Sequence, residues 1–242
     1  PIYMMFVSAL FPSRLQAPVL FGIYASGVLL ALCCARLLKN TLFKAPQRDS
    51  LHHMKRLRLP SLRKVGILMW SRAFMYVRKA GTFILGASII LWFLNTYPRP
   101  EENTAPTNAA AMEHSYAGQI GHWMEPVTQV AGFDWKINSA LVGAFAAKEI
   151  FVTQMGILYA VEDGNSVPAA QQTLNARLKA SYTPLQGISI MIFCLIALPC
   201  IGTVTVAKRE AGTWWFALAQ FGGLTLLGFA TATLIYQAGL LL

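Results

Sequence analysis

Charged residues are scarce in this sequence, and acidic residues are the scarcest. Asp and Glu together number 10 among 242 residues, Lys and Arg number 20, and hydrophobic residues make up 55% of the chain. Because an ordinary soluble domain has about a quarter of its residues charged, this composition excludes that class. It indicates a membrane protein.

Motifs that mark enzymes and small disulfide-bonded proteins are also absent. The sequence has no G-x-x-x-x-G-K-[ST] phosphate loop, no H-E-x-x-H motif and no nucleophile elbow. Its four cysteines show no C-x-x-C spacing, which argues against a disulfide framework. We therefore expect no catalytic residue, no nucleotide-binding residue and no resident cofactor in this chain.

Long apolar runs recur along the sequence, and each span needs roughly 20 apolar residues. We predict an all-α, polytopic integral membrane protein. About five membrane segments are expected, at residues 17–38, 81–97, 137–160, 184–207 and 214–242. Residues 1–16 are interpreted as the end of an upstream membrane element, because the apolar part is too short to span and neither an initiator Met nor a signal peptide precedes it.

The positive charge is concentrated in one region between the first two spans. Residues 36–79 carry 12 of the 20 Lys and Arg against the single acid Asp49. By the positive-inside rule, residues 39–60 form a basic cytoplasmic loop. Residues 61–80 have apolar side chains on one helical face, which predicts an amphipathic helix in the lipid interface. A basic cluster in that setting favours lipid over nucleic acid as its partner.

The loop at residues 98–136 has the opposite character and is predicted to be external, since it holds five acids against Arg99 and Lys136. His114 and His122, with Glu113 and Glu125, are interpreted as surface residues of this loop, with cation gathering at an outer mouth as the alternative. Beyond it, residues 161–183 and 208–213 are predicted loops. The segment 137–160 either crosses fully or is re-entrant, and the two cases place the later loops on opposite sides.

The dipeptide Pro199-Cys200 lies inside an uncharged apolar run. Proline lacks an N–H and presses on the carbonyl four residues back, so the backbone oxygen of Leu195 is expected to lose its helical partner. A free carbonyl beside a thiol suits a soft cation, and Thr203 shares a helical face with Cys200. Cys194 should point elsewhere. The alternative is a kink in a packed helix, with Cys200 as a small contact residue.

Lys148 and Glu149 lie near the middle of the segment 137–160. A charge at the centre of a membrane helix costs roughly 2.5 to 3.5 kcal/mol, so a functional role is the default hypothesis. Adjacent helical residues point about 100° apart, hence each charge needs its own partner. Glu149 shares a face with Thr153. The alternative is that Lys148 snorkels and Glu149 forms a structural ion pair.

Three stretches carry a resemblance to a known family. RKAGTFILGASIILWFL (78–94), GAFAAKEIFVTQMGILY (143–159) and LPCIGTVTVAKREAGTWWFAL (198–218) occur in order after a basic loop. Together they resemble the membrane half of ferrous iron transport protein B, over essentially the whole chain. The resemblance implies a bacterial inner-membrane, multi-pass Fe(II) importer with two related gate-like repeats, of which the second is present here.

The resemblance also implies site residues and partners. Cys200, Glu149, Thr203 and the Leu195 carbonyl would line the metal path, while Pro199, Lys148 and Thr153 would shape or support the gate. Fe(II) would be the transported substrate, and GTP with Mg would belong to an N-terminal GTP-binding domain that this chain lacks. Further expected partners are the lipid bilayer, the first gate repeat, small cytoplasmic accessory proteins and further copies of the protein.

Two rival functions follow from the same residues. The first is a transporter of another substrate on the same gate-like repeat, such as a nucleoside or a different divalent metal. A nucleoside would need stacking and hydrogen-bonding groups, so its binding would be insensitive to thiol reagents. The second rival is a non-transporting membrane scaffold in which Lys148 and Glu149 only hold subunits together.

Overall fold

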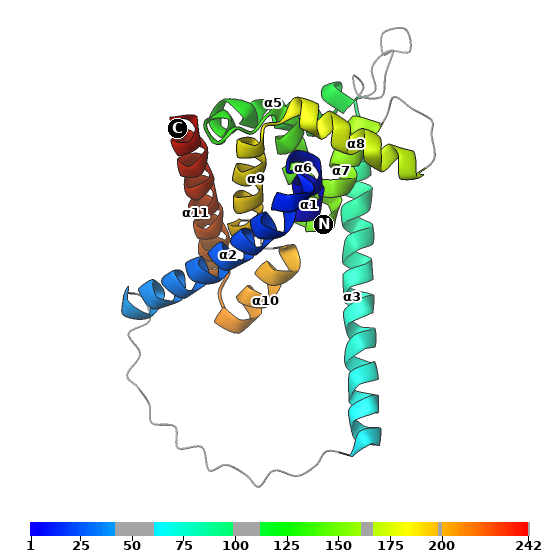
Figure 1. Ribbon diagram of the computed structural model, residues 1–242. Coiled ribbons are helices and arrows are strands. Elements are labelled where there is room, and N and C mark those ends of the chain that lie inside the picture. The colour runs from blue at the N-terminus through cyan, green and yellow to red at the C-terminus, as the bar shows by residue number, and fades with distance from the viewer. Residues whose placement is uncertain (42–60, 99–111, 161–166, 198–199, 242) are drawn as a thin grey trace. The chain divides into compact units, whose positions relative to one another are not determined.

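The computed structural model describes residues 1–41, 61–98, 112–160, 167–197 and 200–241 (Figure 1). Within those ranges helices are the only regular elements, which confirms the predicted all-α class. They are α1 (Ile2–Leu10), α2 (Ser13–Thr41), α3 (Leu62–Thr96), α5 (Tyr116–Thr128), the 3-10 turn η1 (Gln129–Ala131), α6 (Trp135–Ala146), α7 (Lys148–Ala160), α8 (Val167–Ser181), α9 (Pro184–Ile196), α10 (Ile201–Ala211) and α11 (Trp214–Leu240).

The chain divides into two units. One comprises residues 1–27 and 89–242, and the other comprises residues 28–88. The second unit contains the end of α2 and most of α3, and many of its large apolar side chains are exposed, among them Leu32, Ile67 and Trp70. Such exposure is expected of helices whose solvent is lipid rather than water.

Two helices, α2 and α11, are each long and apolar enough to cross a membrane. The helices Leu174–Ser181 and Pro184–Ile196 meet the same criterion together, but they are bent by 104°, as in a broken span or a re-entrant loop. By length and composition, the described residues thus provide two candidate spans, or three with the bent pair. The last part of α3, Ile84–Thr96, is a shorter apolar helical stretch.

Several expected segments are divided differently in the structure. The expected segment 137–160 consists of α6 and α7, interrupted at Ala147, whose backbone is extended (φ −155°, ψ 135°). Residues 61–96, expected as two elements, lie almost entirely in the single helix α3, and the interfacial placement of its first half stays a prediction. Most of the basic loop 39–60, and part of the external loop, fall outside the described residues.

Two of the expected loops carry helices. The stretch 98–136 contains α5 and η1, and the stretch 161–183 contains α8. In α8, Leu174 and Leu178 are four residues apart and both buried, so the helix has a short apolar face that packs against α1. Hydropathy averaged over a membrane-length window does not detect a face of this size.

The core of the larger unit is built around α1. Six of its nine residues are buried, and Phe6 is completely so. The Phe6 ring lies 6.1 Å from that of Phe151 in α7 and 6.3 Å from that of Tyr182, which follows α8. This apolar helix therefore serves as the common packing partner of α7, α8 and α9.

Helices α9 and α11 lie against each other, and small residues allow the close approach (Figure 1). A Cβ at Gly228 of α11 would lie 3.0 Å from the backbone nitrogen of Ala197, just after α9. The Ser189 hydroxyl of α9 donates to the carbonyls of Ala131 (2.7 Å) and Ala232 (3.2 Å). Glycine contacts and hydroxyl bonds of this kind are typical of helix packing in membranes.

A reciprocal amide pair joins the end of α3 to α7. Asn95 Nδ2 donates to Gln154 Oε1 at 3.0 Å, and Gln154 Nε2 donates to Asn95 Oδ1 at 2.7 Å. Gln154 is 2% exposed. Because each amide satisfies the other, the pair fixes the register between two helices whose surroundings are apolar.

Candidate functional site

The apolar run around Cys200 forms two helices with a break between them. Thr183 and Gln186 form a capping box that starts α9, and this helix ends when Ala197 turns extended (φ −78°, ψ 174°). Cys200 is the N-cap of α10, and its carbonyl accepts the N–H groups of Thr203 (2.8 Å) and Val204 (3.2 Å). Leu198 and Pro199 lie outside the described residues, so the role of the proline stays a prediction.

The break brings two oppositely polarised helix ends into one short stretch of chain. The last carbonyls of α9 carry partial negative charge, and the first N–H groups of α10 carry partial positive charge. Discontinuous helices of this kind are where transporters hold ions, because the unpaired backbone groups replace water. The break therefore has the chemistry of an ion site.

The Cys200 thiol is exposed and lies beside a hydroxyl. Its Sγ is 3.3 Å from Thr203 Oγ1, as expected from their spacing of three residues. Cys194, by contrast, is fully buried in the core and points away from solvent. The two thiols thus occupy different environments although they lie six residues apart. A thiol and a hydroxyl on one face give the start of α10 both a soft and a hard donor.

Lys148 is the first residue of α7, directly after the extended Ala147. Its Nζ donates to the carbonyl oxygen of Cys194 at 2.6 Å, a short hydrogen bond to the last turn of α9. The ammonium also lies within electrostatic range of both the Cys194 and Cys200 thiols. Because α7 begins at Lys148, directly after the interruption, the positive charge of Lys148 lies at the end of α9.

This contact differs in detail from the sequence-based expectation. The sequence predicted an unpaired carbonyl at Leu195, and the bond from Lys148 is to the preceding carbonyl, that of Cys194. Their adjacent positions on a helix predicted separate partners for Lys148 and Glu149, and the partner of Lys148 is a backbone oxygen. No spacing rule could identify it, because 46 residues separate the two.

Glu149 is exposed in the first turn of α7, where a negative charge is favoured by the helix dipole. Its backbone carbonyl accepts the Thr153 hydroxyl at 3.5 Å. Within the part of the chain that the structure describes, its carboxylate forms no ion pair. The roles of Glu149 and Thr153 in a metal path stay predictions.

A metal held by many side chains is not found at this break. Among the described residues, no group of three or more His, Cys, Asp or Glu side chains is placed to hold a metal ion. The donors that the break does offer are one thiol, one hydroxyl and backbone carbonyls. Such a mixed set suits a cation that binds briefly and is released, as permeation requires.

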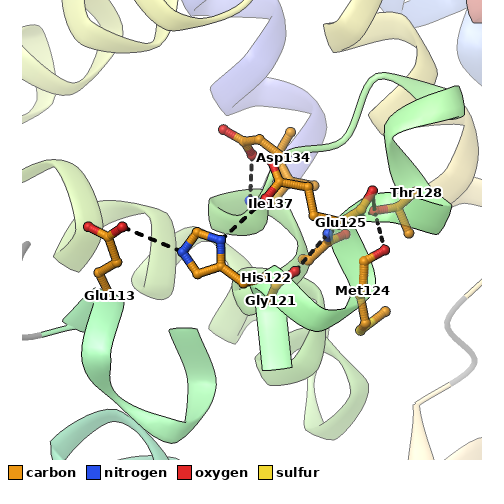
Figure 2. A network of polar contacts seen from close by, with 9 residues as sticks. Glu113, Gly121, His122, Met124, Glu125, Thr128, Asp134 and Ile137 are labelled. Carbon is orange, nitrogen blue, oxygen red and sulfur yellow. Dashed lines mark hydrogen bonds and ion pairs between the residues drawn. The ribbon is translucent and has the colours of Figure 1, made fainter. Parts of the chain in front are cut away.

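A second polar cluster lies on the predicted external side (Figure 2). His122 Nε2 is 3.5 Å from Glu113, and its Nδ1 is 3.3 Å from Glu125. The imidazole ring stacks on Trp135 at 4.9 Å. Figure 2 shows the two carboxylates on opposite sides of the ring, so they do not converge on one point. The cluster links side chains within the stretch 112–136, and among the described residues it does not form a group that could hold a metal ion.

A chain of hydroxyl groups leads from Asp134 into the core. Tyr182 donates to Asp134 Oδ2 at 2.9 Å, and Tyr159 donates to Tyr182 at 3.1 Å. Asp134 also caps α6 by accepting the N–H of Ile137 at 2.9 Å. Burial raises the pKa of the Asp134 carboxyl above its ordinary value, and these hydrogen bonds oppose the rise. Sequence reasoning missed this network; an Asp before an apolar helix signals the cap alone.

The sequence pattern of the Gate family, described as nucleoside recognition, matches residues 77–214. The pattern described as ferrous iron transport protein B C terminus matches residues 20–72. No solved structure shows a significant match.

Curated relatives match nearly the full chain. The Fe(2+) transporter FeoB of Campylobacter jejuni is 35% identical over 91% of this chain and 36% of the relative. The Fe(2+) transport protein A/Fe(2+) transporter FeoB fusion protein of Porphyromonas gingivalis is 33% identical over 100% and 33%, respectively. The FeoB of Staphylococcus aureus (strain COL) is 30% identical over 99% and 34%. The chain thus spans about a third of the length of these relatives.

Proposed function

Because the chain belongs to the FeoB family, of which it forms the C-terminal membrane portion, we propose that it is the permease part of a bacterial Fe(II) importer. The ion moves across the inner membrane through a path that includes the break between α9 and α10. The path is gated by a GTP-binding domain elsewhere in the longer protein, and that domain supplies GTPase activity and Mg binding. The longer protein also contains the first gate repeat. Small cytoplasmic proteins and further copies of the importer are its expected partners.

The observation that supports this proposal most directly is the break itself. At the break, the exposed Cys200 thiol lies beside the Thr203 hydroxyl. Cys200 is four residues beyond Ile196, the last residue of α9. Fe(II) is borderline in softness and accepts thiolate, hydroxyl and carbonyl donors. Few protein ligands leave room for water or for exchange, so the ion can move on. Pro199, Leu195 and Glu149 complete the proposed path or shape it.

The first test is radio-iron uptake under reducing conditions. The full-length protein is expressed in cells that lack other Fe(II) importers, either unchanged or with Cys200→Ala. Cys194→Ala is the matched control, because that thiol is buried in the core and lies in the same run. Since outer-shell partners of metal ligands already change affinity about 10- to 100-fold, we expect at least a tenfold loss for Cys200→Ala.

Uptake by the Cys200→Ala variant is interpreted by comparison with the Cys194→Ala control. Cys194→Ala should keep uptake within about twofold of the unchanged protein, because it removes little volume and no proposed side-chain ligand, and it keeps the backbone carbonyl at position 194. Equal uptake by the Cys200 and Cys194 variants, at equal amounts in the membrane, would remove Cys200 from the path.

Nucleoside transport is the second candidate, because the matching Gate family is described as nucleoside recognition. A nucleoside would be held by stacking and by hydrogen bonds rather than by a thiol. Uptake of labelled nucleoside that is unaffected by Cys200→Ala, together with no iron uptake, would favour this candidate over the Fe(II) importer.

A further inference from the structure

The carbonyl end of α9 binds a cationic side chain of the protein itself, that of Lys148. In its last turn, the carbonyl of Phe193 accepts the N–H of Ala197 at 2.8 Å. The carbonyl of Cys194 accepts the ammonium of Lys148 at 2.6 Å. A helix C-terminus that is not continued attracts cations through the carbonyl oxygens that lack an intrahelical partner, and at the Cys194 carbonyl the cation bound is the ammonium of Lys148.

The approach of Lys148 depends on a second break. Ala147 is extended, and α7 starts at Lys148 directly after it. In a continuous helix over residues 135–160, Lys148 would lie near the middle of the helix. Its ammonium would then lack the local freedom to reach the end of α9. This side chain therefore links the two interrupted segments, α6–α7 and α9–α10.

We propose that Lys148 is a tethered cation that closes the proposed Fe(II) path, and that the incoming divalent ion must displace its ammonium from the α9 carbonyl end. This inference rests on the proposed function and assigns the gate a specific residue. One carbonyl oxygen cannot serve both cations at full strength, and an ammonium and a divalent ion repel each other at such short range. Lys148 and Fe(II) occupy the carbonyl end of α9 alternately.

A simple helix cap is the competing explanation, since Lys side chains often bind the last carbonyls of a helix. The two roles differ in what they do to substrate affinity. A cap supports the fold, so its loss lowers the amount of active protein or kcat and leaves KM unchanged. A competitor for the ion position raises KM when present, so its loss lowers KM.

The kinetic test uses the full-length protein in liposomes with GTP and with Fe(II) kept reduced by ascorbate. Initial rates of Fe(II) entry are measured over a range of concentrations for the unchanged protein, Lys148→Met and Lys148→Arg. Lys148→Met removes the charge at similar length, and we expect KM to fall by about tenfold. Lys148→Arg keeps a cation and should restore KM to within about twofold of the unchanged value. An unchanged KM in Lys148→Met would overturn the proposal.

A second measurement needs no variant, so it decides the question even if Lys148→Met fails to insert. The unchanged protein is treated with a membrane-permeant amine reagent, with and without saturating Fe(II), and modification is read at each lysine by mass spectrometry. Displacement predicts that Fe(II) raises modification of Lys148 several-fold. Lys208, whose ammonium lies 4.8 Å from the Trp214 ring, is the control and should not change.

The outcomes distinguish failure of the displacement proposal from failure of the proposed function. If the preparation transports Fe(II) but modification of Lys148 does not respond to it, the displacement proposal fails and the proposed function stands. If the unchanged protein moves no Fe(II), the proposed function fails, and the role of Lys148 as its gate fails with it.

Discussion

Gln154 is nearly fully buried and exchanges two hydrogen bonds with Asn95, so Gln154→Leu should destabilise the protein in a way that depends on Asn95. The substitution keeps most of the volume but removes both bonds. It also leaves the half-buried Asn95 amide with an unsatisfied donor and acceptor. The expected loss of unfolding free energy is about 1–3 kcal/mol, the usual effect of orphaning a buried polar group.

A double-mutant cycle isolates the pair. Hydrogen bonds between membrane helices contribute on average about 0.6 kcal/mol and at most about 1.7 kcal/mol each. Two such bonds give an expected coupling of about 1–3 kcal/mol. Asn95→Leu together with Gln154→Leu should therefore destabilise much less than the two single changes added, because no amide is left orphaned.

The assay is unfolding of the full-length protein in detergent, with free energies compared for the unchanged protein, the two single variants and the double variant. Gln237→Leu is the control, since Gln237 is exposed and makes one bond to the carbonyl of Val130 at 2.8 Å. It should change stability by no more than about 0.5 kcal/mol. A coupling below about 0.3 kcal/mol, within the scatter of independent sites, would show that the pair does not hold the end of α3 against α7.

Two further predictions concern packing and pH. Gly228→Ala should destabilise the protein by about 1–3 kcal/mol, because the added Cβ meets the backbone of Ala197 at the end of α9, which cannot yield cheaply. Gly223→Ala in the same helix meets nothing within 4 Å and should be neutral or slightly stabilising in the same unfolding assay; equal losses in both would contradict the packing argument. Asp134 should make stability fall as pH rises, since burial holds its folded-state pKa above the unfolded value, and the stabilisation is complete below the unfolded pKa and is lost through the folded one. Asp134→Asn retains an N-cap and should flatten the dependence of the thermal unfolding midpoint on pH between about 3 and 7; an unchanged slope would show that another group sets it.

Much of the site was predictable because it depends on local spacing. The position of Pro199 predicted an interrupted helix, and α9 does end at Ile196 before α10 starts at Ile201. Cys200 and Thr203 are three residues apart, so a helix alone brings the thiol to the hydroxyl. The scarcity of charge and the apolar runs similarly predicted a helical membrane protein, since only helices satisfy their own backbone in lipid.

The remaining features depend on how helices pack, which short-range patterns do not contain. Leu174 and Leu178 make α8 a helix with a buried face only because α1 lies against it. The His122 contacts with Glu113 and Glu125 likewise arise from the fold of the stretch 112–136, whereas the sequence predicted surface residues, with cation gathering as the alternative.

The sequence by itself determined the class of protein, the apolar segments and the places where helices cannot continue. Tertiary structure alone decided the partners of the buried polar groups: Lys148 with the Cys194 carbonyl, Asn95 with Gln154, and Asp134 with Tyr182. These partners are separated by 46, 59 and 48 residues. The physical reason is that a buried donor or acceptor must be satisfied, but which group satisfies it depends on which helix faces are brought together.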